Sequence, residues 1–479
     1  MALRVRALAL ALVATIARAA CVIPPKRPAP SDRTFVSPVI DSAIAALVPR
    51  FLDVNMATLF ANTLPNALDT TILLHNSSAG AEDTFLVTGD IPAMWLRDST
   101  NQVWPYLRYA PQDPALRSLL RGLIRRQVYN VLHAPYANAF QLNASTPGEH
   151  ASDVVFPADL KSNLVFEAKW ESDSLSNVLR LASAYYNATA DASPFDTDFV
   201  AAVRLILATF RQQQLGSDAE DAAGGAAYSF QRDTPEPSDS LEHGRGPPAA
   251  SGTGLIKCGF RGSDDALLLP FNIAENAFAA SALTSASALL SALGLDADAA
   301  SAASLSQEVR AGIAAYGVMR HSITKTDVWA YEVDGYGNQV FMDDANIPGL
   351  LSMPYYGFAQ SDDPLYVSTR AALLSSVNPY WISGSAGAAI GGPHNGRPWV
   401  WPMSMSTRAW TSDDPAEIAQ QLAWLLNSSA CTGFIHESFM KDDVTTFTRP
   451  WFAWANSQFG DLILKVIDEH PELLLKAET

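Results

Sequence analysis

Apolar residues recur at spacings of three and four along much of the chain, which is the pattern of amphipathic helices. An Ala-rich run from Ala274 to Ala315 predicts one or two helices, and the segment after Asp414 has a clear helix start, because Pro415 and Glu417 follow. The segments predicted as helices carry Leu116, Leu119, Leu120, Leu123 and Ile124; Leu175, Val178, Leu179, Ala182 and Tyr186; Phe199, Val203, Ile206, Leu207 and Phe210; and Ile418, Leu422, Leu425 and Leu426. The chain is therefore expected to be all-α.

Strand patterns are sparse, and the best runs from Val328 to Met342, where Asp334-Gly335 and Gly337-Asn338 are typical of hairpin turns. Residues 216–254 are rich in Gly, Ala, Pro and acidic residues, which predicts a loop insertion. Helical patterns continue on both sides of it, so we expect a single domain over residues 35–479. Residues 20–34, rich in Pro, Lys and Arg, are expected to form a flexible leader.

Short segments rich in Trp, Arg, Asp, Pro and Gly alternate with the helical stretches. They are Thr88 to Trp104, Glu167 to Asp173, Phe260 to Asn276, Phe341 to Pro348, Gly392 to Arg408 and Thr432 to Ser457. We predict that these six segments are loops that converge at one end of a helical toroid, where a rigid scaffold positions functional side chains.

The charge balance restricts the class of partner. Of the 479 residues, 32 are Lys or Arg and 49 are Asp or Glu, which gives a formal net charge of −17. Nucleic acids and anionic membrane surfaces attract basic faces, so neither is expected to be the main partner. A neutral substrate fits better.

Residues 1–19 have the pattern of a secretory signal peptide. Arg4 and Arg6 precede an apolar run from Ala7 to Ile16, and Ala17-Arg18-Ala19 is a small-x-small cleavage site. The apolar run is shorter than the roughly 20 residues of a membrane span, so we expect secretion rather than membrane anchoring. Acceptor sequons for N-glycosylation begin at Asn76, Asn143, Asn187 and Asn427.

Three cysteines, Cys21, Cys258 and Cys431, are too few for a disulfide scaffold or a thiolate metal cluster. Cys258 and Cys431 each precede a motif that carries acidic residues. The sequence is compatible both with a disulfide between these two and with two free buried thiols.

Two stretches combine residues suited to a sugar site. The run Thr432 to Ser457 contains Glu437, Arg449 and two Trp residues, and the run Thr88 to Ser99 contains Trp95, Arg97 and Asp98. Carboxylates and Arg bind the polar edges of a sugar ring, whereas aromatic side chains cover its apolar faces. The alternatives are solvated loop acids with core Trp residues in the first stretch, and a structural Arg-Asp ion pair in the second, for Asp90 above all.

Several motifs together resemble glycoside hydrolase family 125, the exo-acting α-1,6-mannosidases. They are the runs Thr88 to Tyr106, Lys169 to Leu175 and Gly259 to Ala266, the pair Pro393-His394, and the run Thr432 to Ser457. They occur in the family's order, and the similarity spans roughly residues 35 to 470. The resemblance implies an (α/α)6 barrel with the active site formed by loops at one end. The chain departs from the family pattern at Gly262, where Pro is favoured, and in the insertion before Cys258.

The resemblance further implies an inverting hydrolysis with one general acid and one general base. It indicates Asp264 as the acid, with Asp265 as the alternative, and Glu437 as the base. We expect the charge of Asp265 to keep Asp264 protonated. Alternatively, Asp265 caps a following helix.

The resemblance also indicates residues for binding the terminal mannose: Trp95, Arg97 and Asp98, with Glu171, Asp173, His394 and Arg449 as further candidates. No metal or other cofactor is expected, because the eight His residues show no paired ligand spacing, and His394 is expected to form a hydrogen bond. The predicted substrate is a mannose-containing oligosaccharide or glycoprotein glycan. The alternatives are a helical-barrel glycosidase of other linkage preference and a secreted carbohydrate-binding protein without turnover.

Overall fold

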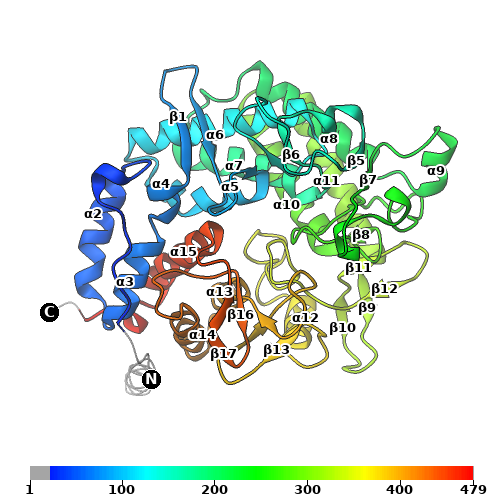
Figure 1. The fold of residues 1–479 in the computed structure, drawn as a ribbon. Coiled ribbons are helices and arrows are strands. Elements are labelled where there is room, and N and C mark those ends of the chain that lie inside the picture. The colour runs from blue at the N-terminus through cyan, green and yellow to red at the C-terminus, as the bar shows by residue number, and fades with distance from the viewer. Residues whose placement is uncertain (1–21, 478–479) are drawn as a thin grey trace.

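The computed structural model describes residues 22–477, and its helices surround a common centre in two rings (Figure 1). The inner helices are α5 (Leu96–Val103), α7 (Ser172–Thr189), α10 (Ile273–Ala292), α13 (Pro402–Trp410) and α15 (Ala453–Glu469). The outer helices are α3 (Val54–Thr63), α6 (Pro114–His133), α8 (Thr197–Gln212), α11 (Asp296–Tyr316), α12 (Pro364–Leu373) and α14 (Pro415–Ser428). Inner and outer helices alternate along the chain, which is the arrangement of an (α/α)6 barrel. The predicted fold class is confirmed.

The inner ring is closed between α10 and α13 by residues 350–358, which form irregular turns. Pro354 lies inside this segment and lacks the backbone N–H that a regular helix requires. The Tyr356 hydroxyl donates to the carbonyl of Ala274 in α10 (3.2 Å), and Tyr355 packs edge-on against Trp410 of α13, with ring centroids 4.8 Å apart. The segment therefore takes the place of a sixth inner helix.

Helix starts follow the capping chemistry that the sequence indicates. Asp414 accepts a hydrogen bond from the backbone N–H of Ala416 (2.9 Å), with Pro415 in the first turn of α14. Asp113 caps α6 in the same way ahead of Pro114. The Ala-rich run forms two helices, α10 and α11, which pack against each other. Each predicted helix is thus present.

The strands are short and pair only in antiparallel sheets of two or three. They are β1 (Ile72–Asn76), β2 (Asp83–Leu86), β3 (Met94–Trp95), β4 (Ala139–Phe140), β5 (Val154–Phe156), β6 (Val165–Glu167), β7 (Ser229–Gln231), β8 (Phe271–Asn272), β9 (Val318–Arg320), β10 (Asp327–Trp329), β11 (Glu332–Val333), β12 (Gln339–Val340), β13 (Trp381–Ser383), β14 (Ala388–Ile390), β15 (Trp399–Val400), β16 (Ser438–Met440) and β17 (Asp443–Thr448). The predicted hairpin is β11–β12, with Glu332 opposite Val340 and the Asp334 carboxylate accepting from three backbone N–H groups of the turn. These strands brace the loops between helices.

Residues 22–34 pack against the domain, unlike the flexible leader predicted for this segment. Ile23 is buried, and its N–H donates to Asn55 (2.9 Å), while Arg27 pairs with Asp69 (2.7 Å). The local composition could not show that these basic residues have acidic partners further along the chain. Two smaller helices, α2 (Pro38–Leu47) and α4 (Asn66–Thr70), follow.

The insertion is also folded. It contains α9 (Ser217–Ala222), the strand β7, which pairs with β5, and two 3-10 turns, η5 (Pro237–Asp239) and η6 (Glu242–Gly244). One continuous cluster of buried apolar side chains extends from Ile23 to Leu475 and includes residues of every ring helix named above.

The cysteines match neither of the two alternatives compatible with the sequence, a Cys258–Cys431 disulfide or two free thiols. Cys258 is a buried free thiol that donates to the Glu275 carboxylate (Sγ to Oε2, 3.1 Å), and Cys431 is disulfide-bonded. A Cys258–Cys431 disulfide is therefore wrong, because the thiol of Cys258 faces α10. The predicted signal peptide, residues 1–19, lies outside the described residues. Across residues 22–477, no helix has the length and apolarity that crossing a membrane requires.

Candidate active site

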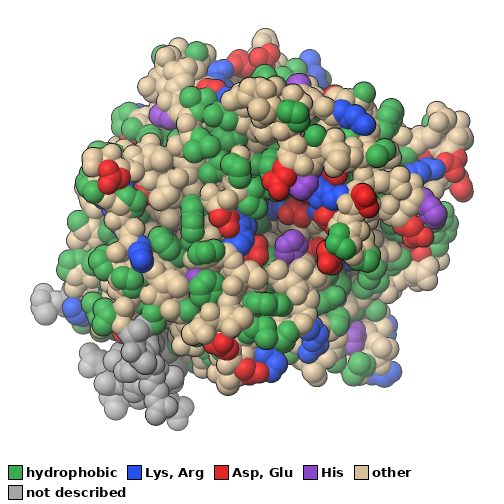
Figure 2. Space-filling model, in the orientation of Figure 1, with side chains coloured by type: hydrophobic (Ala, Val, Ile, Leu, Met, Phe, Trp, Pro, Cys, Tyr) green, Lys and Arg blue, Asp and Glu red, His purple; other side chains and the backbone are tan. Residues whose placement is uncertain are grey.

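A pocket opens at the end of the ring where the predicted loops converge. Figure 2 shows acidic, basic and His side chains gathered in the depression at the centre of this face. Five of the six predicted loop segments line the pocket, through Arg97, Asp264, Asn346, His394 and Glu437 among others. The sixth, Glu167 to Asp173, lies beneath Arg97. The predicted convergence is confirmed.

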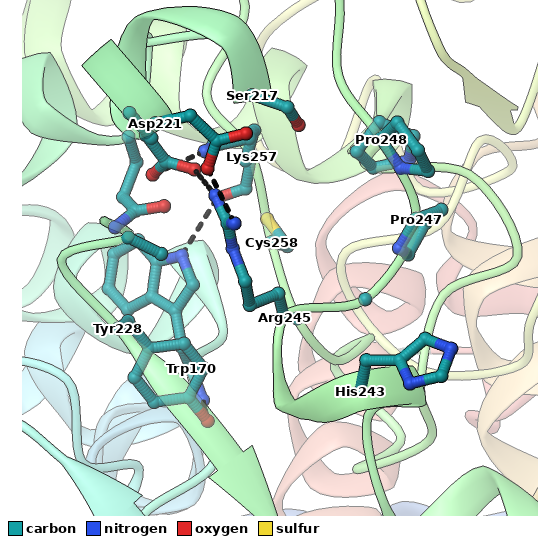
Figure 3. A pocket seen from close by; sticks show the side chains of 16 residues that line it. Trp170, Ser217, Asp221, Tyr228, His243, Arg245, Pro247, Pro248, Lys257 and Cys258 are labelled. Atoms are coloured by element: carbon teal, nitrogen blue, oxygen red, sulfur yellow. Dashed lines mark hydrogen bonds and ion pairs between the residues drawn. The ribbon is translucent and has the colours of Figure 1, made fainter. Parts of the chain in front are cut away.

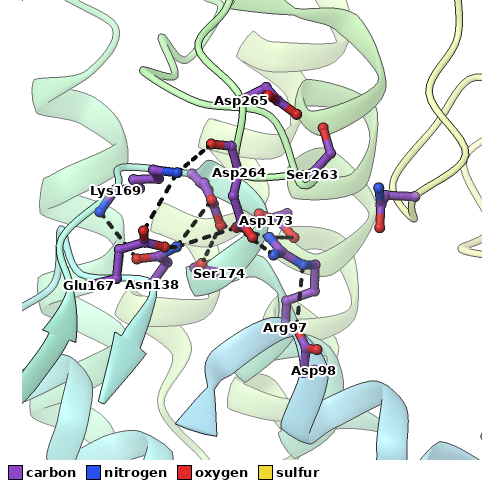
Figure 4. Close-up of polar contacts among 12 residues, drawn as sticks. Arg97, Asp98, Asn138, Glu167, Lys169, Asp173, Ser174, Ser263, Asp264 and Asp265 are labelled. Carbon is purple, nitrogen blue, oxygen red and sulfur yellow. Dashed lines mark hydrogen bonds and ion pairs between the residues drawn. The ribbon is translucent and has the colours of Figure 1, made fainter. Parts of the chain in front are cut away.

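Arg97 lies at the base of the pocket, in the first turn of α5, and only 3% of its side chain is exposed. Its guanidinium donates to Glu171 (2.6 Å), Asp264 (2.9 Å) and Asp173 (3.4 Å), and Asp98 is 3.6 Å from its Nε (Figure 4). Glu171 and Asp173 come from the start of α7. One guanidinium thus joins two inner helices to the loop that carries Asp264.

The cluster contains more carboxyl groups than cations, so it retains protons. Burial raises the pKa of Asp98 to about 6 and that of Asp173 to about 6, although Arg97 opposes both shifts. Burial also raises the pKa of Glu171 well above its ordinary value, with the Asp264 and Asp173 charges adding to the shift. A buried charge without a partner is costly, so protonation limits the excess negative charge.

Asp264 and Glu171 share a hydrogen bond, and the two groups have opposite pKa shifts. Burial alone would raise the pKa of Asp264, but Arg97, the hydrogen bond from Glu171 and the Lys169 charge together hold it well below its ordinary value. The Glu171 hydroxyl therefore donates to an ionised Asp264. Asn138 Nδ2 also reaches both groups, at 3.2 Å and 3.5 Å.

Asp265 does not line the pocket. Its carboxylate lies 3.2 Å from His394 Nδ1, and it does not cap a helix. Burial alone would lower the pKa of His394, but Asp265, Glu437 and Asp264 raise it to about 9. The expectation that Asp265 keeps Asp264 protonated is therefore wrong, because Asp265 pairs with an imidazolium while Arg97 stabilises the ionised form of Asp264.

Glu437 occupies another wall of the pocket, immediately before β16. Its carboxylate accepts from the Thr448 hydroxyl (3.1 Å) and lies 3.4 Å from Arg449 Nη1. Arg449 is fixed in turn by Asp90 (Nε to Oδ1, 2.9 Å). Asp90 therefore has the structural role in an Arg-Asp ion pair that the sequence left open as an alternative. Two donors thus orient one buried carboxylate toward the pocket.

Aromatic side chains supply the remaining walls. Trp95, Trp401, Phe452 and Trp454 line the pocket. The Nε1 groups of Trp95 and Trp401 are buried and have no hydrogen-bond partner within the described chain. Buried indole N–H groups usually have partners, so these two are free to donate to a bound ligand.

The structure brings most predicted site residues to one pocket. The residues that line it are Trp95, Arg97, Asp98, Asp264, His394, Glu437 and Arg449. Glu171 and Asp173 are fully buried and hold Arg97 from beneath. In residues 22–477 there is no group of three or more His, Cys, Asp or Glu side chains arranged to hold a metal ion.

The sequence interpretation did not single out several residues of the site. Asn346 and Trp401 line the pocket from segments already identified by their mixed composition, so that signal was available. Lys169 donates to the backbone carbonyl of Asp264 (2.7 Å) and stands within the Lys169 to Leu175 motif. Asn138 lies in a segment with no distinguishing pattern.

A family model described as metal-independent α-mannosidase, glycoside hydrolase family 125, matches residues 53–464. The meiotically up-regulated gene 157 protein of Schizosaccharomyces pombe is 42% identical over 95% of this chain and 90% of its own length.

Among solved structures, a metal-independent α-mannosidase from Streptococcus pneumoniae, in a non-productive complex with α-1,6-mannobiose, superposes with a TM-score of 0.84. It is 35% identical, and the match covers 91% of this chain and 99% of that one. A bacterial glucoamylase in complex with acarbose has a TM-score of 0.55 at 11% identity, over 90% of this chain and 58% of its own, which shows the fold alone.

The His394–Asp265 pair predicts a pH-dependent contribution to stability, tested with His394→Gln. Because the folded-state pKa of His394 is raised, its contribution is full below the unfolded pKa of about 6.5. The contribution is lost as pH rises through about 9. In urea unfolding, the free energy of unfolding of the wild type should therefore exceed that of the variant most at low pH. This difference should shrink toward pH 9 and beyond.

The exposed His243, substituted as His243→Gln, provides the matched control for this measurement. If the difference in free energy of unfolding between wild type and His394→Gln stays constant across the pH range, the His394–Asp265 pair makes no pH-dependent contribution to stability and the prediction is wrong.

Proposed function

The chain belongs to glycoside hydrolase family 125 and is a metal-independent α-mannosidase, and we propose that it is a secreted, exo-acting enzyme that removes terminal α-1,6-linked mannose with inversion. One observation carries the proposal: Asp264 and Glu437, from loops far apart in the sequence, line one pocket with Arg97 and aromatic side chains. Its proposed substrates are mannose-containing oligosaccharides or glycoprotein glycans. The complex of the Streptococcus pneumoniae relative with α-1,6-mannobiose supports the choice of linkage.

In the proposed mechanism, Glu437 removes a proton from a water molecule, and the water oxygen bonds to the anomeric carbon on the face opposite the leaving group. The bond from that carbon to the glycosidic oxygen breaks, and Asp264 gives the leaving oxygen a proton. Inverting enzymes require carboxyl groups about 6.5–9.5 Å apart, which leaves room for the water.

The proton that Asp264 donates is drawn from the pair that it forms with Glu171. Glu171 holds this proton before the reaction, since the pKa of Asp264 lies well below that of its partner. As the glycosidic oxygen gains negative charge, it becomes the better proton acceptor, and the proton moves through Asp264 to the leaving group.

Exo action is supported by the closed base of the pocket. Arg97 and its buried carboxyl partners lie beneath Asp264, so a glycan enters with its terminal residue first. The unpartnered indole N–H groups of Trp95 and Trp401 are suited to donate to hydroxyls of that residue. A helical-barrel glycosidase with another linkage preference is the alternative.

Time-resolved NMR of α-1,6-mannobiose with the enzyme tests linkage and stereochemistry together. We expect the β-anomer of mannose to exceed its equilibrium share at first and then mutarotate, because inversion converts the α-linkage of the non-reducing residue into a β-hemiacetal, whereas the reducing-end residue is released as its equilibrium mixture. The matched controls are α-1,2- and α-1,3-mannobiose, which should persist. An initial excess of α-mannose over its share in the equilibrium mixture would contradict inversion, and equal cleavage of the controls would contradict the linkage preference.

The catalytic assignments predict distinct behaviour for three substitutions. Asp264→Asn and Glu437→Gln preserve size but remove proton transfer, which is typically worth about 10²–10⁴-fold in rate. Mannosyl fluoride needs little protonation of its leaving group, so it should partly rescue Asp264→Asn but not Glu437→Gln.

Asp265→Asn is the control for the choice within the adjacent pair, with kcat measured on both substrates. If Asp265→Asn loses turnover of mannobiose and is rescued by mannosyl fluoride while Asp264→Asn stays active on mannobiose, the general acid is Asp265. Near-normal turnover by Glu437→Gln would contradict its role as the base.

Secretion is supported by the pattern of residues 1–19, by the disulfide at Cys431 and by the exposure of all four sequon Asn residues. Expression of the full chain in a secreting eukaryotic host should yield medium protein that lacks the first 19 residues and loses mass on deglycosylation. Amino-terminal sequencing and mass spectrometry measure both. Retention in the cells with residues 1–19 attached would contradict secretion.

A further inference from the structure

The insertion, residues 216–254, reaches from the outer edge of the barrel to the loop that carries Asp264. Its strand β7 is followed by Arg232, whose guanidinium donates to Asp153 (2.9 Å), Glu167 (3.0 Å) and Asp239 (3.0 Å). This ties the insertion to the segment before α7. The site described above does not require any residue of the insertion to touch the substrate.

Asp239, in the 3-10 turn η5, is linked to the catalytic loop through one lysine. Lys169 Nζ donates to the Asp239 carboxylate (2.5 Å) and to the backbone carbonyl of Asp264 (2.7 Å). The Lys169 side chain is 4% exposed, and Figure 4 shows it beside Asp264 and Glu167. Burial alone would lower its pKa, but Glu167, Asp264 and Asp239 raise it well above the ordinary value, so it remains a cation.

A second contact comes from the residue before Asp239. The backbone carbonyl of Ser238 accepts from the N–H of Ala266 (2.7 Å), two residues after Asp264. The insertion therefore holds the catalytic loop at two points: at the Asp264 carbonyl through Lys169, and at Ala266 directly.

The loop needs such support because Asp264 has a φ of +68°. A non-glycine residue in this region is strained and persists only where surrounding contacts impose it. The same conformation directs the Asp264 carboxylate to Arg97 while Asp265 faces His394. A relaxed loop would thus displace the proposed acid.

We infer that Asp239 is a positioning residue for catalysis: through Lys169 it fixes the backbone of Asp264, so that the insertion sets the placement of the general acid. This inference rests on the proposed function, because it takes Asp264 to be the acid. It adds a role for a segment that departs from the family's sequence pattern.

The test compares Asp239→Ala with Asp221→Ala, a matched change in the same insertion. Asp221 pairs with Arg245 (2.7 Å) in the neighbourhood of Lys257 and Cys258, away from the catalytic loop (Figure 3). Lys169→Met removes the donor itself. For each variant, kcat and KM are measured on α-1,6-mannobiose and on mannosyl fluoride, together with Tm.

A misplaced acid slows the substrate that needs leaving-group protonation. Misplacement of catalytic groups by about 1 Å can cost roughly 100-fold in rate, so Asp239→Ala and Lys169→Met should lower kcat on mannobiose by about 10- to 100-fold. Their kcat on mannosyl fluoride should change much less, and KM should be unchanged. Asp221→Ala should match the wild type on both substrates.

Equal slowing of both substrates by Asp239→Ala, or identical behaviour of Asp239→Ala and Asp221→Ala, would overturn the positioning role. Asp264→Asn, assayed in parallel, separates the two proposals. If it shows the leaving-group dependence and Asp239→Ala does not, the acid assignment stands and the positioning role fails. If Asp264→Asn turns over mannobiose normally, the acid assignment fails, and the role of Asp239 fails with it.

Discussion

The buried ion-pair cluster around Arg97 is the interaction on which the site depends. Without this guanidinium, Glu171, Asp173 and Asp264 would be acidic groups placed close together with little water to solvate them. Removing one partner from a buried ion pair commonly costs about 3–5 kcal/mol, because it leaves a charge uncompensated. Arg suits this place better than Lys, since its planar fork presents several donors at fixed angles. The cluster therefore fixes the packing of α5 against α7, and it also decides which carboxyl groups hold protons.

The ring turns this local cluster into a site because the inner helices begin at the pocket. Trp95, Glu171, Trp401 and Phe452 are the N-cap residues of α5, α7, α13 and α15, and each lines the pocket or lies directly beneath it. The amino ends of helices carry partial positive charge, which favours carboxylates nearby. Side chains at these ends are also held by the regular helix that follows. A ring of such helices thus gathers acids and aromatic residues from distant parts of the chain at one rigid place.

Adjacent residues in the catalytic loop have different environments because the backbone turns sharply between them. Asp264 has a positive φ and faces Arg97 and Glu171, whereas Asp265 faces His394 and is absent from the pocket wall. The same loop contacts the insertion through Lys169 and Ser238. The insertion, whose composition predicts only a loop, therefore contacts the loop that carries the proposed general acid.

The sequence by itself determined the helices, because spacings of three and four and capping residues act over short distances: Asp414 caps α14 wherever the helix lies. The closed (α/α)6 ring was expected only through the family resemblance. It also identified the loops by their mixed composition, and most pocket residues through the resemblance of their motifs to the family. Only the tertiary structure decided the protonation of Asp264, the free thiol of Cys258 and the fixed position of residues 22–34. Each of these depends on a partner far along the chain, Arg97, Glu275 and Asp69 respectively. Charge and burial act through space, so local composition cannot specify them, and the pairing of Asp239 with Lys169 became visible only once the chain was folded.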